Sequence, residues 1–321
     1  MKAAIVKAPE AIPEYGEFAD PPAEEGFELV DLVAAGLHPI VRSLAAGRHY
    51  GSTGSWPLIP GIDAVARTAA GELIYTGFVR PPYGTFAQRM AVPKRMRIAL
   101  PSGADPLAVA AGLNPGLSSW LPLNARVAEL GAIGTVLILG ATGMAGLLAV
   151  QHARLLGASA VIGVGRNPLA LARAAAFGAK TVALTGDHSA DAEALARALD
   201  GAAPSIVLDF LWGAPAETAF AALARRGLEE DTANIAYVQI GAMAGPDASV
   251  PAALLRSRRI RISGSGAGSA SIADVMAQIP VYMQLIADRK IEVPTHAFAL
   301  ASISQAWTAP AENTRRIVVV P

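Results

Sequence analysis

The stretch VLILGATGMAGLLAVQHARLLGASAVIGVGRNP, residues 136–168, decides the fold of this chain. It overlaps an uncharged run, residues 130–151, that is long enough to cross a bilayer, since a spanning helix needs about 20 apolar residues. The run contains five glycines, however, and each glycine inside a helix costs roughly 1 kcal/mol relative to alanine. The glycines therefore divide the run into separate elements, and a membrane helix is not expected.

The elements around these glycines predict a βαβ unit. TVLIL, residues 135–139, is typical of a short strand buried on both faces, and GATGMAG, residues 140–146, is a turn. The residues from 144 to Gly157 have helical character, and SAVIGV, residues 159–164, is a second strand. A strand, a glycine turn, a helix and a strand within about thirty residues form the unit that binds dinucleotides.

Each glycine of the turn has its own expected role. Gly140 permits a tight exit from the strand, Gly143 lets the backbone approach a pyrophosphate, and Gly146 lets the helix pack close to the sheet. The anion then meets free N–H groups and the positive end of the helix dipole. A plain buried turn is the alternative, because alanine replaces the first glycine of the usual motif. The residues predicted to contact the dinucleotide here are Gly140, Ala141, Thr142, Gly143, Met144, Ala145 and Gly146.

The same alternation continues along the chain. Four further strands, separated by alanine-rich helical segments, are expected at TVAL, SIVLDF, NIAYVQIG and IRISGS, residues 181–184, 205–210, 234–241 and 260–265. Strands that alternate with helices predict an α/β fold with a doubly wound parallel sheet.

The end of the second strand bears on which dinucleotide is bound. An NAD site usually has an acid about 20 residues past the turn, where it accepts hydrogen bonds from the ribose hydroxyls. Here Gly165 stands at that place, and Arg166 and Asn167 follow. Glycine leaves room for a 2′-phosphate that a carboxylate would repel, and a guanidinium binds phosphate well. These residues predict NADPH, and a solvated surface arginine is the alternative.

Composition narrows the remaining functions. A length of 321 residues suggests two domains, and 26 basic residues balance 26 acidic ones, so no overall charge favours nucleic acid or an anionic membrane. The chain has no cysteine, and its five histidines lack metal-binding spacing, so we expect no metal. The start of the sequence lacks the apolar segment of a secretory signal, and a cytoplasmic location is the expectation.

On these residues the chain resembles the medium-chain dehydrogenase/reductase family, and within it the zinc-free quinone oxidoreductase branch. The resemblance is nearly end to end and rests on the order and spacing of short motifs. These motifs are MKAAIV (1–6), VAAGLHPI (33–40), PLIPGIDAV (57–65), GTFAQRM (84–90), GLSSW (116–120), VLILGATGMAG (136–146), GRN (165–167) and RRIVVVP (315–321).

The resemblance implies a chaperonin-like (GroES-like) β-rich catalytic domain into which a Rossmann domain is inserted. Residues 1–116 and 266–321 are expected to form the catalytic domain and residues 117–265 the NADPH-binding domain, with the active site in the cleft between them. Zinc-dependent members have a cysteine near AAGLHP and a histidine after the glycine of PGID. Those places hold Leu37 or His38 and Ile62 here. Without a Lewis acid, reduction of a conjugated carbonyl is more natural than alcohol oxidation.

Two residues are expected to take part in the chemistry. Tyr50 matches the tyrosine that lines the cleft and is assigned as proton donor in related enoyl reductases; the alternative is a tyrosine that only packs at the wall. His38 replaces the family's usual asparagine and is expected either to bind substrate or cofactor or to be an ordinary hydrogen-bonded histidine.

Further cofactor contacts are expected on a helix and after the last strands. Ser118 occupies the usual threonine position near the nicotinamide carboxamide, and Asn114 lies one helical turn earlier; the alternative for both is a capping or core-polar role. Tyr83 and Trp212 supply either aromatic walls or core packing. Backbone contacts are expected from Gly241, Ala242, Ser265 and Gly266, which follow strands at the carboxyl edge of the sheet.

The leading hypothesis is a zinc-independent, NADPH-dependent oxidoreductase that transfers hydride to a quinone or an α,β-unsaturated carbonyl. The alternatives are a zinc-free alcohol or ketone dehydrogenase and a non-catalytic NADPH-binding sensor. The expected partner is a small-molecule substrate, with neither nucleic acid nor membrane, and the resemblance implies a homodimer that pairs through IRISGSG, residues 260–266.

Overall fold

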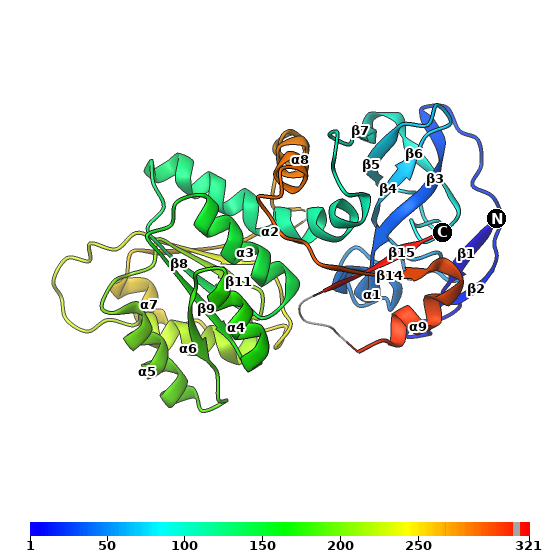
Figure 1. Cartoon of the computed structure of the whole chain (residues 1–321). Coiled ribbons are helices and arrows are strands. Elements are labelled where there is room, and N and C mark those ends of the chain that lie inside the picture. Colours follow the sequence, from blue (N-terminus) through cyan, green and yellow to red (C-terminus); the bar gives the residue numbers. More distant parts are fainter. Residues whose placement is uncertain (267, 311–314) are drawn as a thin grey trace. The chain divides into compact units, whose positions relative to one another are not determined.

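The computed structural model describes residues 1–266, 268–310 and 315–321, and the chain divides into two compact units (Figure 1). We call Gly116–Met276 the Rossmann unit, and Met1–Pro115 with Ala277–Pro321 the β-rich unit. The sequence prediction divides the chain after residues 116 and 265 instead.

A parallel sheet of six strands forms the Rossmann unit, in the order β10-β9-β8-β11-β12-β13. The chain runs outward from β8 in one direction and then returns to build the other half, so the predicted doubly wound α/β sheet is confirmed. The strands are β8 (Thr135–Leu139), β9 (Ala160–Gly165), β10 (Lys180–Ala183), β11 (Ile206–Asp209), β12 (Ile235–Gln239) and β13 (Ile260–Gly264).

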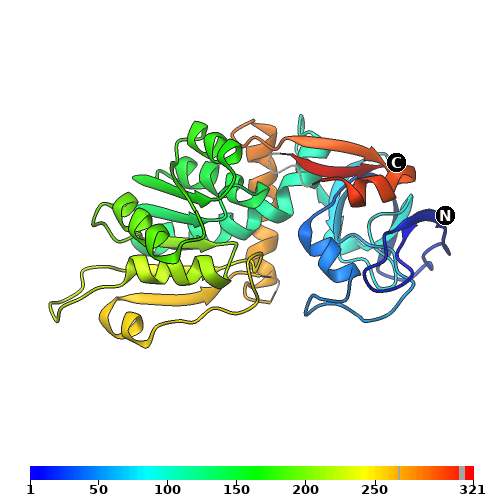
Figure 2. The same ribbon diagram turned by 90° about the horizontal axis from the view of Figure 1, so that it is seen from below.

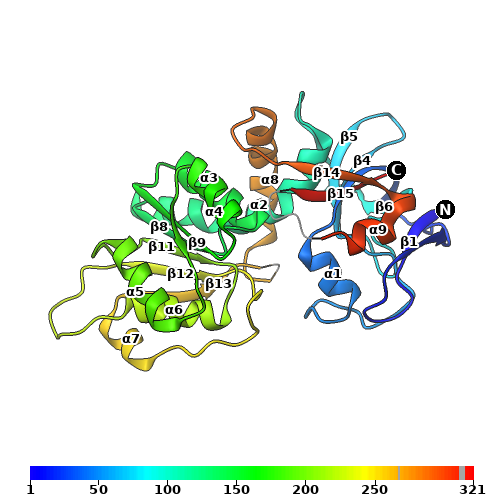
Figure 3. The same cartoon turned by 60° about the horizontal axis from the view of Figure 1, so that its bottom comes forward.

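Helices cover both faces of this sheet, as Figure 3 shows. The apolar run of β8 explains why both faces need cover: Val136 and Ile138 belong to one hydrophobic cluster, while Leu137 and Leu139 belong to the other. These helices include part of α2 (Pro106–Leu130), whose Leu123 belongs to the first of these clusters. The others are α3 (Met144–Leu155), α4 (Pro168–Ala176), α5 (His188–Leu199), α6 (Gly213–Leu223) and α7 (Ala252–Ser257).

The β-rich unit holds a second sheet, in the order β14-β15-β3-β4-β5-β7, with β6 paired to β3. Its strands pair antiparallel except for β14 and β15, which are parallel and lie side by side in Figure 2. Because β15 pairs with β3, residues from both parts of this unit share one sheet. Its strands are β3 (Phe27–Gly36), β4 (Asp63–Arg67), β5 (Leu73–Gly77), β6 (Arg89–Pro93), β7 (Ile98–Ala99), β14 (Thr295–Ala299) and β15 (Arg316–Val320), and a separate pair joins β1 (Lys2–Ile5) to β2 (Glu14–Glu17).

The remaining elements are helical. They are α1 (Pro39–Ala45), η1 (Lys94–Met96), α8 (Ile272–Ala287), η2 (Leu300–Ser302) and α9 (Ile303–Thr308). Across the part of the chain that the structure describes, no helix combines the length and apolarity needed to cross a membrane.

Candidate active site

The glycine turn between β8 and α3 has the geometry that its sequence predicts. Gly140 has φ +93°, a value that favours glycine, and its N–H and that of Ala141 both donate to the Val164 carbonyl at 2.9 Å. A Cβ atom on Gly146 would lie 2.1 Å from the Gly140 carbonyl oxygen, so only glycine lets the helix approach the turn this closely.

Gly143 and the start of α3 form a cradle for an anion. The nearest atom to a Cβ built on Gly143 is 3.8 Å away, so space remains beside this backbone. Within the described residues, the N–H groups of Met144, Ala145 and Gly146 have no backbone acceptor, since the first helical bond runs from Leu147 to Gly143. Unpaired N–H groups at the positive end of a helix suit a phosphate, so this turn fits the pyrophosphate of a dinucleotide.

Position 165 has a close neighbour that the sequence does not reveal. A Cβ atom on Gly165 would lie 2.3 Å from Cγ2 of Thr142. The threonine of the glycine turn already occupies this space. Any side chain at position 165 would require that threonine to shift. That this glycine leaves room for a 2′-phosphate stays a prediction.

Arg166 and Asn167 follow at the end of β9. The Arg166 side chain is exposed and makes no hydrogen bond or ion pair with any described residue. Asn167 begins α4 and its side-chain oxygen accepts a hydrogen bond from the Ala170 N–H at 3.0 Å. The oxygen of Asn167 therefore caps the helix, which leaves its amide NH₂ and the Arg166 guanidinium as donors at this corner.

The structure brings Ser118 and Ser265 together. The Ser265 hydroxyl donates to the Ser118 carbonyl at 3.3 Å, and the Ser265 N–H donates to the Gln239 carbonyl at 2.8 Å. Asn114 and Ser118 are both half-buried in α2, among mostly buried neighbours, and the spacing of four residues puts them on one face of the helix. Gly266 donates its N–H to the Ser269 hydroxyl at 2.6 Å.

Asp209 organises the loops that follow β11 and β12, and sequence reasoning missed it. Its carboxylate accepts hydrogen bonds from the N–H groups of Leu211 and Trp212, at 2.8 and 2.9 Å, and from the Tyr237 hydroxyl at 2.6 Å. Burial raises the pKa of Asp209. The N–H of Gly241 donates to the Asp209 carbonyl at 3.1 Å. The signal for this role is an acid that ends the otherwise apolar strand SIVLDF.

Backbone packing holds the loop after β12 against the loop after β11. A Cβ atom on Gly241 would lie 2.7 Å from the Phe210 carbonyl oxygen, and the Ala244 N–H donates to the Leu211 carbonyl at 2.8 Å. Ala242 is exposed in the same loop. These contacts place Gly241 and Ala242 at the carboxyl edge of the sheet, where ligands bind in open α/β folds.

Tyr50 lies on a turn of the β-rich unit, and its side chain is 80% exposed. Its ring stacks on that of His49, with centroids 4.0 Å apart, and His49 Nδ1 accepts a hydrogen bond from the Gly51 N–H at 3.0 Å. Burial lowers the pKa of His49, which favours the neutral ring that this bond requires. The exposed hydroxyl of Tyr50 is open to a ligand, and its role as proton donor stays a prediction.

His38 lies in a buried polar cluster of the β-rich unit. The residue is 1% exposed and its Nε2 is 3.5 Å from Asp63 Oδ1, a separation too long for a hydrogen bond. The other oxygen of Asp63 accepts a hydrogen bond from the Tyr75 hydroxyl at 2.8 Å. Burial lowers the pKa of Arg316 to about 10, with Asp63 acting in the opposite direction. Neither ring nitrogen of His38 has a hydrogen-bond partner among the described residues.

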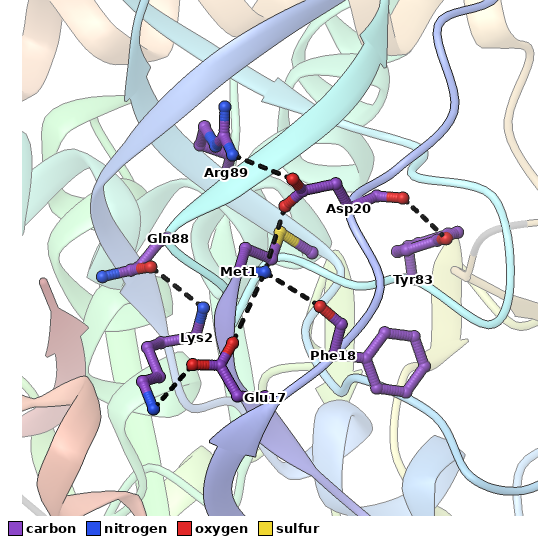
Figure 4. Close-up of polar contacts among 8 residues, drawn as sticks. All are labelled: Met1, Lys2, Glu17, Phe18, Asp20, Tyr83, Gln88 and Arg89. Carbon is purple, nitrogen blue, oxygen red and sulfur yellow. Dashed lines mark hydrogen bonds and ion pairs between the residues drawn. The ribbon is translucent and has the colours of Figure 1, made fainter.

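The two aromatic candidates pack against other rings. Tyr83 meets Phe18 edge to face at 5.7 Å, and its hydroxyl donates to the Asp20 carbonyl at 3.2 Å (Figure 4). Asp20 is in turn paired with Arg89 at 3.1 Å. Trp212 packs edge to face on Phe220 at 6.0 Å. Both contacts agree with the packing interpretation of these residues.

The donor set of the β-rich unit does not fit a zinc ion. Leu37 and Ile62 offer no ligand atom, the chain has no cysteine, and the imidazole of His38 is left with the carboxylate of Asp63. Over the described ranges, which omit residues 267 and 311–314, no group of three or more His, Cys, Asp or Glu side chains is arranged to hold a metal ion.

Known proteins resemble this chain over its whole length. Residues 145–285 match the zinc-binding dehydrogenase family. A probable NADPH-dependent quinone reductase of Emericella nidulans is 29% identical over 351 aligned residues, which cover 96% of each chain. The quinone oxidoreductase of Thermus thermophilus, known also in complex with NADPH, has a TM-score of 0.79 at 25% identity, with 100% of both chains covered. A mycobacterial protein complexed with NADPH has a TM-score of 0.82 at 20% identity, again with 100% of both chains covered.

Proposed function

We propose that this chain is a member of the medium-chain dehydrogenase/reductase family and an NADPH-dependent oxidoreductase that reduces a quinone or an α,β-unsaturated carbonyl. The observation that carries the proposal is the joint geometry of the turn and of the neighbouring strand end. Gly143 stands beside open space at the start of α3, and the next strand ends in a glycine and an unpaired arginine. A pyrophosphate fits the first place and a 2′-phosphate the second.

NADPH supplies the hydride when it is bound, and the protein's own groups have three tasks. The backbone N–H groups at the start of α3 bind the pyrophosphate, and the Arg166 guanidinium binds the 2′-phosphate with charge-assisted hydrogen bonds. The hydroxyl of Tyr50 donates a proton to the oxygen on which negative charge develops. Exposure of this hydroxyl supports the assignment, since a buried phenol would not reach a substrate.

The names of two similar proteins favour a quinone over an alcohol. The relative from Emericella nidulans is a probable quinone reductase and the Thermus structure is a quinone oxidoreductase. The residues at the family's zinc positions include Leu37 and Ile62, which have no ligand atoms, and they do not favour an alcohol dehydrogenase that needs a Lewis acid. Without a zinc ion to stabilise the charge on oxygen, a side chain of the protein has to donate the proton.

An absorbance assay with matched cofactors tests the proposal. Purified protein should consume NADPH in the presence of a quinone or a short enone, and should be slow with simple ketones and, in reverse, with alcohols and NADP⁺. Turnover of alcohols or ketones alone would replace the proposal with a dehydrogenase, and binding of NADPH without turnover of any substrate would indicate a sensor.

The Arg166→Ala variant tests the choice of cofactor. A hydrogen bond to a charged group contributes on the order of 1.5–3 kcal/mol, so one or two such bonds should favour NADPH over NADH by roughly ten- to a few-hundredfold. Arg166→Ala should erase most of this preference by weakening NADPH and leaving NADH almost unchanged. Equal wild-type affinities, or an equal loss for both cofactors, would return Arg166 to the solvated surface.

A further inference from the structure

We infer that Thr142 is the residue that fixes the cofactor selectivity of position 165, by keeping that position free of any side chain. The inference rests on the proposed NADPH function, because it concerns the same corner of the Rossmann unit. Three distances carry it. A Cβ atom built on Gly165 would lie 2.3 Å from Thr142 Cγ2, 3.0 Å from its Oγ1 and 3.2 Å from its Cβ.

All three of the nearest atoms belong to one side chain, so the closest obstacle is a single residue. The backbone itself does not demand glycine here, since Gly165 lies outside the set of glycines with positive φ. The backbone conformation of β9 at this position therefore accepts an L-residue, and the nearest obstacle is the neighbouring threonine. This separates Gly165 from Gly140, where φ is +93° and the backbone conformation favours glycine.

Neither backbone is free to move aside. The Gly165 carbonyl accepts a hydrogen bond from the Leu184 N–H at 2.8 Å, and Ala183 pairs with Gly165 in the register of β10 and β9. On the other side, the Ala141 N–H donates to the Val164 carbonyl at 2.9 Å, and the Gly143 N–H donates to the Gly140 carbonyl at 3.2 Å. Thr142 is held between these two bonds, and its branched side chain is stiff about χ1.

The chemical consequence concerns the acid of an NAD site. At this position a carboxylate accepts hydrogen bonds from the ribose hydroxyls and repels a 2′-phosphate. Thr142 excludes the carboxylate because it excludes the Cβ that would carry it. The preference for NADPH then has two sources. Arg166 attracts the 2′-phosphate, and Thr142 excludes the carboxylate at position 165 that would favour NADH.

A stability cycle tests the steric step without any cofactor. Gly165→Ala should lower the melting temperature of the protein by roughly 3–10 °C, the usual effect of overpacking, and Thr142→Ala should restore most of that loss in the double variant. Of the three nearest atoms, the Thr142 Cβ alone would then remain, at 3.2 Å.

Gly163→Ala is the matched control, because it lies on the same strand and its Cβ would meet Ala141 Cβ at 3.0 Å. Its effect on the melting temperature should be the same with threonine or alanine at position 142. If Gly165→Ala also lowers the melting temperature equally with threonine and with alanine at position 142, the inference is overturned, whether or not the protein binds a cofactor.

Direct titration with NADH and NADPH tests the selectivity step. Gly165→Asp alone should be destabilised and gain no affinity for NADH, whereas the Thr142→Ala/Gly165→Asp double variant should bind NADH roughly tenfold more tightly than wild type and NADPH at least tenfold more weakly. If Gly165→Asp alone keeps the wild-type melting temperature and binds NADH as the double variant does, Thr142 has no such role. If wild type binds neither cofactor while the stability cycle shows coupling, the proposed function fails and the packing of Thr142 on Gly165 stands.

Discussion

The two units of the molecule build their candidate site residues in different ways. In the Rossmann unit the turn from Gly140 to Gly146 is one continuous segment, and close backbone packing fixes its shape. In the β-rich unit the cluster around His38 takes Asp63 from β4, Tyr75 from β5 and Arg316 from β15. A continuous backbone site is sensitive to added atoms, whereas a site made of side chains is sensitive to their removal.

The strongest test of this difference adds one carbon atom to each of two neighbouring glycines. Gly146→Ala places a Cβ 2.1 Å from the Gly140 carbonyl oxygen, so it should lower the free energy of unfolding by about 1–3 kcal/mol and weaken NADPH binding by about 10²-fold or more. In Gly143→Ala the nearest atom to the new Cβ would be 3.8 Å away, so this variant should fold normally. It should still weaken NADPH binding, because the new methyl group fills the space where the pyrophosphate would approach the backbone.

Denaturant unfolding and fluorescence titration of the two variants give the answer. The expected pattern is a loss of both stability and binding for Gly146→Ala and a loss of binding alone for Gly143→Ala. If Gly143→Ala binds NADPH as tightly as wild type, the cradle is not the pyrophosphate site.

In the β-rich unit the corresponding test removes one oxygen atom. Tyr50→Phe should lower kcat by about 10²-fold with an enone if Tyr50 is the general acid. The melting temperature should stay unchanged, because the side chain is 80% exposed. Steady-state kinetics on wild type and variant decide whether Tyr50 is the proton donor. An unchanged kcat would mean that Tyr50 only packs beside the site. Turnover that survives with a quinone alone would point to solvent as the donor.

The difference between the units also explains what sequence could predict. The six strands of the parallel sheet and the role of Gly146 follow from local pattern, since a short apolar run and its glycines are legible residue by residue. The obstruction of Gly165 by Thr142 was not predicted, because it joins the turn after β8 to the end of β9 and depends on a side-chain direction.

Asp209 and Asp63 also show what the sequence alone does not predict. Each is an acid at one end of an apolar strand, so its presence is visible in the sequence, while its partners are not. Asp209 binds Tyr237 from β12, and Asp63 binds Tyr75 from β5. Burial makes such pairings necessary, because an unpaired acid in an apolar strand would be costly. The sequence identifies the acid that needs a partner, and the fold identifies the partner.

An effect on stability alone is expected from pH in the Rossmann unit. His152 is fully buried between α2 and α3, where its Nδ1 and the Ser119 hydroxyl are 2.9 Å apart, and burial lowers its pKa from 6.5 to about 3. Between pH 6.5 and about pH 3, His152 is therefore protonated in the unfolded chain and neutral in the folded unit. Stability should fall as the pH drops from 6.5 towards 3, by roughly 1.4 kcal/mol per pH unit from this group alone.

The His152→Gln variant separates this group from the carboxylates that also respond to acid. Its free energy of unfolding should fall less steeply below pH 6.5, by about one proton, even if the variant is less stable at neutral pH. A series of denaturant curves between about pH 7 and about pH 4.5 measures the slope. An identical slope in wild type and variant would mean that His152 is already protonated in the folded unit.

The smallest effect on turnover and stability is expected from the removal of metal ions. This prediction concerns the β-rich unit. The resemblance to the medium-chain dehydrogenase/reductase family puts Leu37 or His38, and Ile62, at the places of zinc ligands. His38 with Asp63 supplies two donor side chains where a catalytic zinc has three. If Tyr50 provides the proton, as proposed, no Lewis acid is needed to stabilise the charge on oxygen. Overnight dialysis against a strong chelator should then leave both turnover and melting temperature unchanged. A loss of turnover that added zinc restores would overturn this assignment, and it would make the buried pair of His38 and Asp63 the first place to look for the ion.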